Sequence, residues 1–298
     1  MIRSWAATPF PPGPSGVLLP RDDRTCASRG LTLYTASKPL PLAIQWVAWA
    51  LVRTLGPRWI PGRAESISIP YLGEVSEGLG MREDALSSVA LYRRRDAVRS
   101  GATFIATGPH TDPILIKVRS TRGRLVQEQE ILEKLAMLTP LSFSVPKAIG
   151  SGQLSDGRAW SAQEMVFTAP HFPCTKLKSQ LLTDLSKALQ LALPTPPADH
   201  PDWTPAHGDL TPWNLRRDHR GRIWLFDWED AGYAPAGADG VYFHAALGLV
   251  RPHRPMPSSS NTAAQFWIER VRDRLAAGHP DQNNIILDRL LRATQPPD

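Results

Sequence analysis

The chain has 298 residues, of which 42% are hydrophobic, so it can bury an ordinary globular core and form about two domains or one two-lobed domain. Two cysteines exclude a disulfide-rich fold, and the N-terminal residues lack the apolar segment of a signal peptide, so we expect a cytoplasmic protein. The net charge of +6 is compatible with anionic ligands. The basic clusters lack interleaved aromatic residues, however, so the sequence does not favour nucleic acid as a partner.

Residues 1–65 are rich in proline and tryptophan, and we expect them to form an N-terminal extension. Within them, residues 42–55 have a helical pattern that is shorter than the roughly 20 residues needed to span a membrane. Two interpretations remain open for this helix. It packs against the body of the protein, or it makes peripheral contact with a membrane, with Trp46 and Trp49 at headgroup level. In the membrane interpretation, three basic residues flank the apolar part of this helix: Lys38, Arg53 and Arg58.

Residues 66–167 have the pattern of a sheet with one helix. Three apolar runs, residues 86–95, 100–108 and 112–120, are joined by short links and predict an antiparallel sheet. Leucine and isoleucine residues at helical spacing predict a helix over residues 123–138. Two short strands around a Ser-Asp-Gly-Arg turn follow, so we predict a five-stranded sheet.

Residues 168–298 are predicted to be mainly helical. Leucines line one side of a helix over residues 174–193, and a proline-rich segment ends it. A hairpin follows, with strands near residues 213–217 and 222–228. Three helices are predicted after the hairpin, over residues 239–250, 261–278 and 282–295.

Three polar residues around the predicted hairpin indicate chemistry. Asn214 offers a carbonyl oxygen and Asp227 a carboxylate, and a hairpin that brings them together lets them bind one or two Mg²⁺ ions. Asp209 lies five residues before Asn214, close to the metal but able to accept a proton from a hydroxyl group. Phosphoryl transfer needs this arrangement, because positioning and charge neutralisation supply most of its catalysis.

The motif HGDLTPWN, His207–Asn214, followed by FDWE, Phe226–Glu229, resembles the aminoglycoside phosphotransferase and choline kinase group. This group is the small-molecule branch of the protein-kinase-like fold, whose protein kinases carry H-R-D-x-x-x-x-N and D-F-G instead. The resemblance implies an α+β, two-lobed fold with an antiparallel N-lobe and a mainly helical C-lobe. It also implies ATP and Mg²⁺ as cofactors and a small-molecule hydroxyl group as phosphate acceptor. In this interpretation Asp209 is catalytic.

The same resemblance implies further site residues. Lys117, in the strand ILIKV, would hold the α- and β-phosphates, and its partner on the following helix would be Glu128, with Glu130 as the alternative. The hinge that meets the adenine would be Glu164, Met165 and Val166. His207 would brace the catalytic loop through hydrogen bonds, and Asp239 would brace the same loop and open a helix.

Some features depart from the family pattern. No G-x-G-x-x-G segment lies between the first two strands of the N-lobe, where Arg93–Arg95 or Arg99 could contact phosphates instead. The interval of residues 168–206 lacks the insertion that builds an acidic pocket in typical antibiotic kinases. Because the chain is also basic, aminoglycosides are not favoured as acceptors.

A second resemblance bears on the acceptor. The segment GLTLYTASKPL, residues 30–40, and the HGDLTPWN and FDWEDA motifs look like phosphotransferase-like proteins of bacterial surface-polysaccharide biosynthesis. This resemblance implies a sugar or glycan intermediate as acceptor, near the inner face of the membrane. The alternative function is a kinase-like scaffold that binds a nucleotide or a partner without transferring phosphate. The sequence indicates no oligomeric state.

Overall fold

The computed structural model describes residues 4–11, 16–34, 36, 38–82, 84–93, 101–120, 122–138, 142–257, 261–279 and 282–294. The chain divides into two compact units. The sheet unit comprises Met1–Gln129 and Pro146–His171, and the helical unit comprises Glu130–Val145 and Phe172–Asp298. The helix α4 (Arg122–Ala136) runs across the division.

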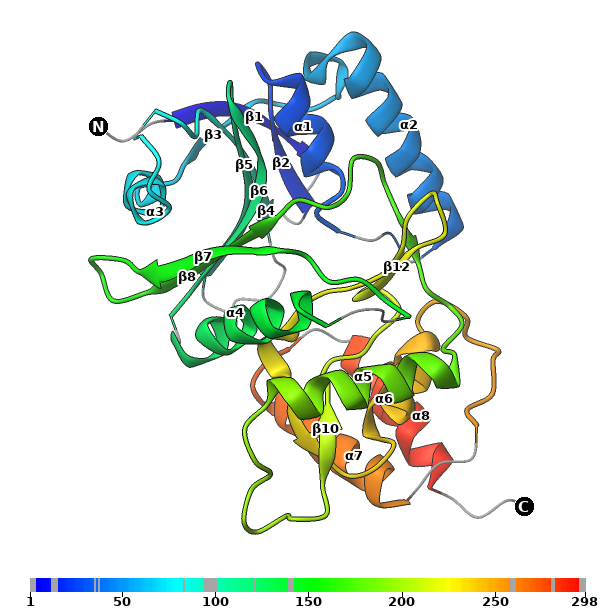
Figure 1. Ribbon diagram of the computed structural model, residues 1–298. Helices are drawn as coiled ribbons and strands as arrows, with labels where there is room; N and C mark the ends of the chain where they lie inside the picture. Colours follow the sequence, from blue (N-terminus) through cyan, green and yellow to red (C-terminus); the bar gives the residue numbers. More distant parts are fainter. Residues whose placement is uncertain are drawn as a thin grey trace. The chain divides into compact units, whose positions relative to one another are not determined.

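The sheet unit is built on one antiparallel sheet of eight strands among the described residues (Figure 1). The five strands predicted from the sequence are present as β4 to β8, and three N-terminal strands extend the sheet. In spatial order the strands are β3 (Glu65–Ser68), β1 (Ser4–Phe10), β2 (Gly16–Pro20), β4 (Ser88–Arg93), β5 (Gly101–Gly108), β6 (Thr111–Arg119), β8 (Ala159–Glu164) and β7 (Ala148–Gln153).

The predicted N-terminal extension, residues 1–65, supplies β1, β2 and the start of β3. β1 pairs with β2 and β3, and β2 pairs with β4. Along β2, Leu18 packs into the apolar cluster on one face of the sheet, whereas Val17 and Leu19 pack into the cluster on the other. Side chains of a strand alternate between faces, so β2 contributes to both layers of the core and belongs to the sheet.

Helices cover both faces of this sheet. α1 (Arg24–Gly30) and α2 (Pro39–Leu55) contribute to one apolar cluster, and α3 (Leu72–Gly78) contributes to the other. The short helix η1 (Pro57–Trp59) follows α2. The Asp23 carboxylate caps α1 by accepting a hydrogen bond from the Cys26 N–H at 2.9 Å. Figure 1 shows α1 and α2 on the same side of the sheet.

α2 is fixed to the sheet unit by its inner side. The buried Gln45 side chain donates hydrogen bonds from Nε2 to the carbonyl oxygens of Leu31 at 2.5 Å and Tyr34 at 3.1 Å. Ala48 and Val52, one and two turns further along, are buried in the same cluster. Because the buried Gln45 amide donates to two carbonyl oxygens of the loop before α2, it fixes the rotation of α2 about its own axis.

The helical unit has a core between its last three helices. The helices of this unit are α5 (Ser179–Ala192), α6 (Ala238–Leu247), α7 (Asn261–Ala276), α8 (Gln282–Ala293) and the short η2 (Trp228–Asp230). Two small sheets accompany them: β9 (Phe172–Pro173) with β11 (Leu215–Arg217) and β12 (Ile223–Leu225), and β10 (Thr204–Ala206) with β13 (Gly232–Ala234). Trp267 of α7 is fully buried and stacks on Tyr242 of α6, with ring centroids 3.9 Å apart.

Within the described part of the chain, no helix is both long and apolar enough to cross a membrane.

Candidate active site

The loop between β10 and β11 carries the predicted catalytic residues, and the predicted hairpin follows it. β11 pairs with β12 in the register Leu215↔Leu225, and the Phe226 N–H donates to the Asn214 carbonyl oxygen at 3.1 Å. Phe226 therefore faces Asn214, and Asp227 follows Phe226 directly in sequence. The hairpin thus brings the two predicted metal ligands to the same end of a short ladder.

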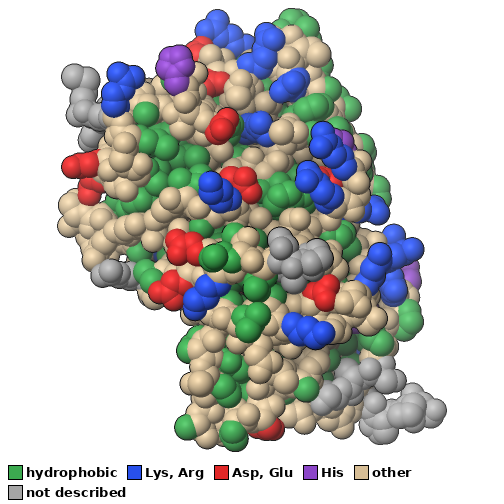
Figure 2. Space-filling view, viewed as in Figure 1, with side chains coloured by type: hydrophobic (Ala, Val, Ile, Leu, Met, Phe, Trp, Pro, Cys, Tyr) green, Lys and Arg blue, Asp and Glu red, His purple; other side chains and the backbone are tan. Residues whose placement is uncertain are grey.

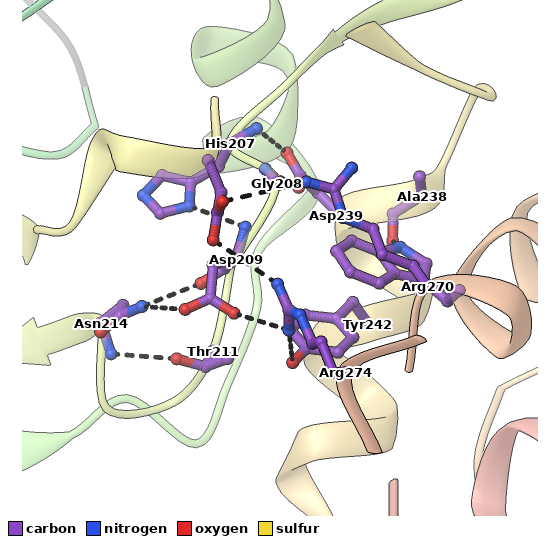
Figure 3. Close-up of polar contacts among 12 residues, drawn as sticks. His207, Gly208, Asp209, Thr211, Asn214, Ala238, Asp239, Tyr242, Arg270 and Arg274 are labelled. Carbon is purple, nitrogen blue, oxygen red and sulfur yellow. Dashed lines mark hydrogen bonds and ion pairs between the residues drawn. The ribbon is translucent and has the colours of Figure 1, made fainter. Parts of the chain in front are cut away.

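Asp209 and Asn214 are joined directly (Figure 3). The Asn214 Nδ2 donates to the Asp209 Oδ2 at 2.9 Å and to the Asp209 carbonyl oxygen at 3.0 Å. The Asn214 N–H bonds the Thr211 hydroxyl oxygen at 3.2 Å, which closes the loop on itself. Because the amide nitrogen is used for Asp209, the carbonyl Oδ1 at the other end of the same amide points away from Asp209.

Asp227 has an unusual backbone conformation. Its φ is +66° and its ψ +65°, and it has the only positive φ of a non-glycine residue within the described ranges. Aspartate and asparagine tolerate this left-handed region better than other side chains. The backbone turns at Asp227, two residues beyond β12 and just before η2, so the carboxylate leaves the line of the strand. Such strained positions cluster at functional sites.

Asp239 braces the loop, as predicted. Its carboxylate accepts hydrogen bonds from the His207 N–H at 2.7 Å and from the Gly208 N–H at 3.2 Å, and it lies in the first turn of α6. Burial raises the pKa of Asp239, and the nearby His207 together with these two N–H groups acts in the opposite direction. The carboxylate therefore fixes the start of the catalytic loop to α6.

His207 also has the structural role predicted for it. The ring is fully buried, its Nε2–H donates to the Phe226 carbonyl oxygen at 3.0 Å, and its Nδ1 accepts from the Asp209 N–H at 3.3 Å. Burial lowers the pKa of His207, although Asp239 and other nearby carboxylates act to raise it. A neutral ring with one donor and one acceptor satisfies both bonds, so His207 ties the loop to the hairpin.

Gly208 stands where protein kinases have arginine, and the structure gives a steric reason. Its φ is +76°, and a Cβ atom at this position would lie 1.9 Å from the Asp230 carbonyl oxygen. Real Cβ contacts are never that close, so a side chain at residue 208 would push the catalytic loop away from the segment that carries Asp227.

We expect Gly208→Ala to lower the free energy of unfolding by about 3 kcal/mol, from left-handed strain of about 1–2 kcal/mol plus a steric conflict of similar size. Gly221→Ala is the matched control, because Gly221 has a φ of +81° and nothing within 4 Å of a built Cβ. The control should lose only the strain, about 1–2 kcal/mol. Urea unfolding of both variants measures the difference, and equal losses would contradict the steric argument.

Arg274 of α7 is a site residue that the sequence analysis missed. Its Nη1 lies 3.4 Å from the Asp209 Oδ1 and donates to the Tyr242 hydroxyl at 2.6 Å, while its Nη2 lies 3.5 Å from the Asp230 Oδ2. Burial alone would lower the pKa of Arg274, but Tyr242, Asp209 and Asp230 together raise it. The guanidinium therefore remains charged and contacts the oxygen of Asp209 that Asn214 does not bond (Figure 3).

A signal for Arg274 is present in the sequence. Trp267, Val271 and Arg274 follow the spacing i, i+4, i+7 on one helical face, and the first two are fully buried. An arginine that continues an apolar face has to be paired with acidic groups, because an unpaired buried charge is costly. Which acidic groups it meets is set by long-range folding, since Asp209 is 65 residues away.

In the sheet unit, the predicted pairing of Lys117 with Glu128 is present. Lys117 lies on β6 between β5 and β8, and its Nζ bonds both carboxylate oxygens of Glu128, at 2.8 and 3.0 Å. Both residues are buried, with exposures of 5% and 1%. Glu130, the alternative partner, is exposed.

The predicted hinge residues follow the end of β8. The Glu164 N–H donates to the Lys147 carbonyl oxygen at 2.9 Å, and its Oε1 accepts from the Lys147 N–H at 2.9 Å. The Met165 N–H donates to the Pro113 carbonyl oxygen at 3.2 Å. These two N–H groups are therefore engaged within the sheet unit, a detail that the sequence could not indicate.

The arginines considered for phosphate contact are placed only in part. Arg93, at the end of β4, forms an ion pair with Glu65 on β3. Arg94, Arg95 and Arg99 lie outside the described residues. The positive charge of Arg93 is thus paired with a carboxylate of the same sheet rather than with a phosphate.

The donor set fits magnesium bound together with a nucleotide. Within the described ranges, no group of three or more His, Cys, Asp or Glu residues could hold a metal by itself. Mg²⁺ in phosphoryl-transfer sites is held by one or two protein carboxylates or carbonyl oxygens plus substrate phosphates. The Asn214 carbonyl and the Asp227 carboxylate are ligands of this kind.

The model of the phosphotransferase enzyme family matches residues 172–278, which include the loop, the hairpin and α7. No curated protein sequence matches the chain.

Similar folds occur among solved structures. Two structures of a thermostable variant of aminoglycoside phosphotransferase APH(4)-Ia, one with ADP and hygromycin B and one with AMP-PNP and hygromycin B, have TM-scores of 0.52 and 0.51. Each is 10% identical, and each comparison covers 75% of this chain and 98% of that one. A putative fructosamine-3-kinase from Haemophilus somnus 129PT has a TM-score of 0.47 at 10% identity, covering 75% and 97%. The predicted α+β, protein-kinase-like fold is confirmed.

Proposed function

We propose that this chain, whose residues 172–278 match the model of the phosphotransferase enzyme family, is an ATP-dependent kinase that transfers the γ-phosphate to a hydroxyl group of a small molecule. The observation that carries the proposal is the Asp209 carboxylate, which Asn214 bonds at 2.9 Å and Arg274 contacts at 3.4 Å. A carboxylate held from both sides is oriented before substrate binds, and orientation is a large part of the catalysis of phosphoryl transfer.

In this proposal Asp209 is the general base. It orients the acceptor hydroxyl group and accepts its proton as the hydroxyl oxygen bonds the γ-phosphorus. The bond from that phosphorus to the bridging oxygen breaks, and ADP leaves. Asn214 and Asp227 hold Mg²⁺, which when bound neutralises charge on the transferred phosphate. The hydrogen bond between Asp209 and Asn214 then links the base to a metal ligand, so both keep a fixed separation.

In the sheet unit, the proposal assigns Lys117 and Glu128 to the nucleotide phosphates. The Lys117 ammonium would contact the α- and β-phosphates, and Glu128 holds that ammonium in position from the far side. The pair is buried, and a buried ion pair is costly to keep unless both charges are compensated. A triphosphate would bring further negative charge to the ammonium.

For the adenine, the proposal assigns contacts around Glu164, Met165 and Val166. The N–H groups of Glu164 and Met165 bond other residues of the sheet unit, so recognition falls to their carbonyl oxygens and to the Val166 backbone. In this assignment the adenine amino group donates a hydrogen bond to one of these backbone carbonyl oxygens.

We further propose that the acceptor is a sugar or glycan intermediate rather than a polycation. Arg274 and Arg270 lie on one face of α7, and their guanidinium groups lie 3.5 and 3.9 Å from carboxylate oxygens of Asp230. A polycationic acceptor brought to Asp209 would find the carboxylates of Asp209 and Asp230 already paired with these two arginines, so they offer it little attraction. A neutral acceptor does not need free carboxylates. An enzyme at the inner face of the membrane would be close to glycan intermediates of this kind.

The competing function is a kinase-like scaffold that binds a nucleotide without transfer. Retention of Asp209, Asn214, Asp227 and Lys117 favours catalysis, because a scaffold needs no base. The two functions are separated by measuring ADP formation from MgATP with a panel of sugars, sugar phosphates and glycan intermediates, with EDTA-treated samples as blanks. We expect Mg²⁺-dependent ADP formation that at least one acceptor stimulates. Nucleotide binding without turnover for every acceptor would favour the scaffold.

A further inference from the structure

The outer side of α2 carries a row of exposed apolar side chains. The row consists of Leu40, Ile44, Val47, Leu51 and Leu55, which are 71%, 49%, 60%, 39% and 50% exposed. The spacing of four, three, four and four residues keeps all five on one helical face. In the space-filling view, hydrophobic side chains appear along the edge where Figure 1 places α2 (Figure 2). A face of this kind on a folded unit marks an interaction surface.

The orientation of this apolar row is fixed from within the sheet unit. Gln45, Ala48 and Val52 are buried on the inner side, so the row cannot rotate inward. Trp46 and Trp49, which the sequence suggested at headgroup level, are not part of the row. Their rings meet edge to face at 5.6 Å, and the Trp49 indole N–H donates to the Thr168 carbonyl oxygen at 3.1 Å.

The charges around the row are positive. α2 contains no acidic residue, Arg53 lies in its last turn, and the exposed Lys38 precedes its first residue. Arg24 of α1 also lies at this end, since its Nη1 donates to the Arg53 carbonyl oxygen at 3.4 Å. Arg58 is already paired with Asp22 at 2.7 Å. An apolar face bordered by cations is complementary to an anionic lipid surface.

We propose that α2 is a peripheral membrane anchor, which lies flat on an anionic bilayer and inserts the apolar row between the headgroups. Its 17 residues give a helix of about 25 Å, too short to cross a bilayer but suited to lie in the interface. The basic side chains at its two ends contact lipid phosphates.

A second copy of the chain is a poorer occupant of this face. A symmetric dimer through α2 would set two identical basic helices against each other, and neither helix has an acidic residue to pair with the other. Like charges in the same interface oppose association. The anionic surface supplies the missing negative charge.

Vesicle flotation of the full chain tests the proposal. The probes are vesicles of phosphatidylcholine alone and of phosphatidylcholine mixed with phosphatidylglycerol. We expect the wild type to float with the mixed vesicles, and V47E/L51E to bind at least about twentyfold more weakly, since each charge near an anionic surface changes binding about fivefold. The neutral variant V47S/L51S, which removes only apolar surface, should also lose binding.

The matched control is L191E/I285E, which adds the same two charges at residues of α5 and α8 that are 68% and 49% exposed. This control should float like the wild type. Replacing Lys38 and Arg53 with glutamine should weaken binding to mixed vesicles about fivefold per residue.

Other outcomes would overturn the anchor. Failure of the wild type to float with the mixed vesicles, or equal flotation of V47E/L51E, would do so. A wild-type dimer in sedimentation that V47E/L51E converts to a monomer would assign the face to self-association instead. None of these measurements depends on kinase activity, so the anchor and the proposed reaction can fail separately.

Discussion

Replacing Asp209 with asparagine is expected to lower kcat about 10²–10⁴-fold, the range that a positioned general base contributes. The change is nearly isosteric, so Asn214 and Arg274 remain beside residue 209, and the loop keeps its bracing by Asp239. The substitution removes the proton acceptor, and with it the negative charge and one of the two oxygen atoms that Asn214 and Arg274 contact. Nucleotide affinity should therefore be unchanged, because Asp209 does not hold the phosphates in this account.

The measurement is ADP formation at saturating MgATP, together with nucleotide binding by calorimetry. Asp184→Asn is the control for the same chemical change outside the catalytic loop, since the half-buried Asp184 lies on α5, where its carboxylate bonds the Ser142 N–H at 3.1 Å and the Gln180 side chain. Turnover near that of the wild type in Asp209→Asn would remove the base from the mechanism.

The second large effect is expected at Asp227, where asparagine should weaken MgATP binding tenfold or more. Loss of residues that merely support a metal ligand costs about 10–100-fold in metal affinity, and a direct carboxylate ligand should cost at least as much. Asparagine is chosen over alanine because the φ of +66° at this position favours aspartate and asparagine. The substitution therefore removes charge without adding backbone strain.

A magnesium titration isolates the cause of this effect. The wild type and Asp227→Asn should bind ATP equally in EDTA and diverge as Mg²⁺ is added, because the carboxylate acts through the metal. A difference of the same size in EDTA would mean that Asp227 supports the fold of the site rather than the ion.

The catalytic loop and hairpin were predictable because their chemistry is local in sequence. Asp209, Asn214 and Asp227 lie within 19 residues, and one turn and one two-stranded ladder bring them together. The helices α2 and α4 to α8 were predicted for a similar reason, since their apolar residues follow helical spacing, whereas the short helices α1 and α3 were not predicted. The pairing of Lys117 with Glu128 also spans only 11 residues.

The N-terminal strands were not predictable from the same rules. β1 contains Pro9, and the segment that leads to β2 is rich in proline and glycine, so local propensity indicates turns. β1 and β2 are stabilised instead by partners far along the chain, such as Arg93, which faces Gly16 in the sheet. Pairing with a distant strand overrides local preference.

For α2 and Arg274, the sequence does not indicate which part of the protein each one packs against. Helical periodicity shows that α2 has two faces, but both are apolar, and the sequence cannot tell which one the sheet unit covers. The buried Gln45 and its two carbonyl partners decide this in the structure. Likewise, the position of Arg274 on a buried face predicts an acidic partner, and only the fold identifies Asp209.

The central claim is most directly tested by a crystal structure of the chain with Mg²⁺ and a non-hydrolysable ATP analogue. The account predicts the Asn214 Oδ1 and an Asp227 carboxylate oxygen at about 2.0–2.1 Å from a magnesium ion that also contacts the phosphates. The Asp209 carboxylate should face the γ-phosphate without binding the metal. A nucleotide whose phosphates and metal lie away from Asn214 and Asp227 would contradict the account.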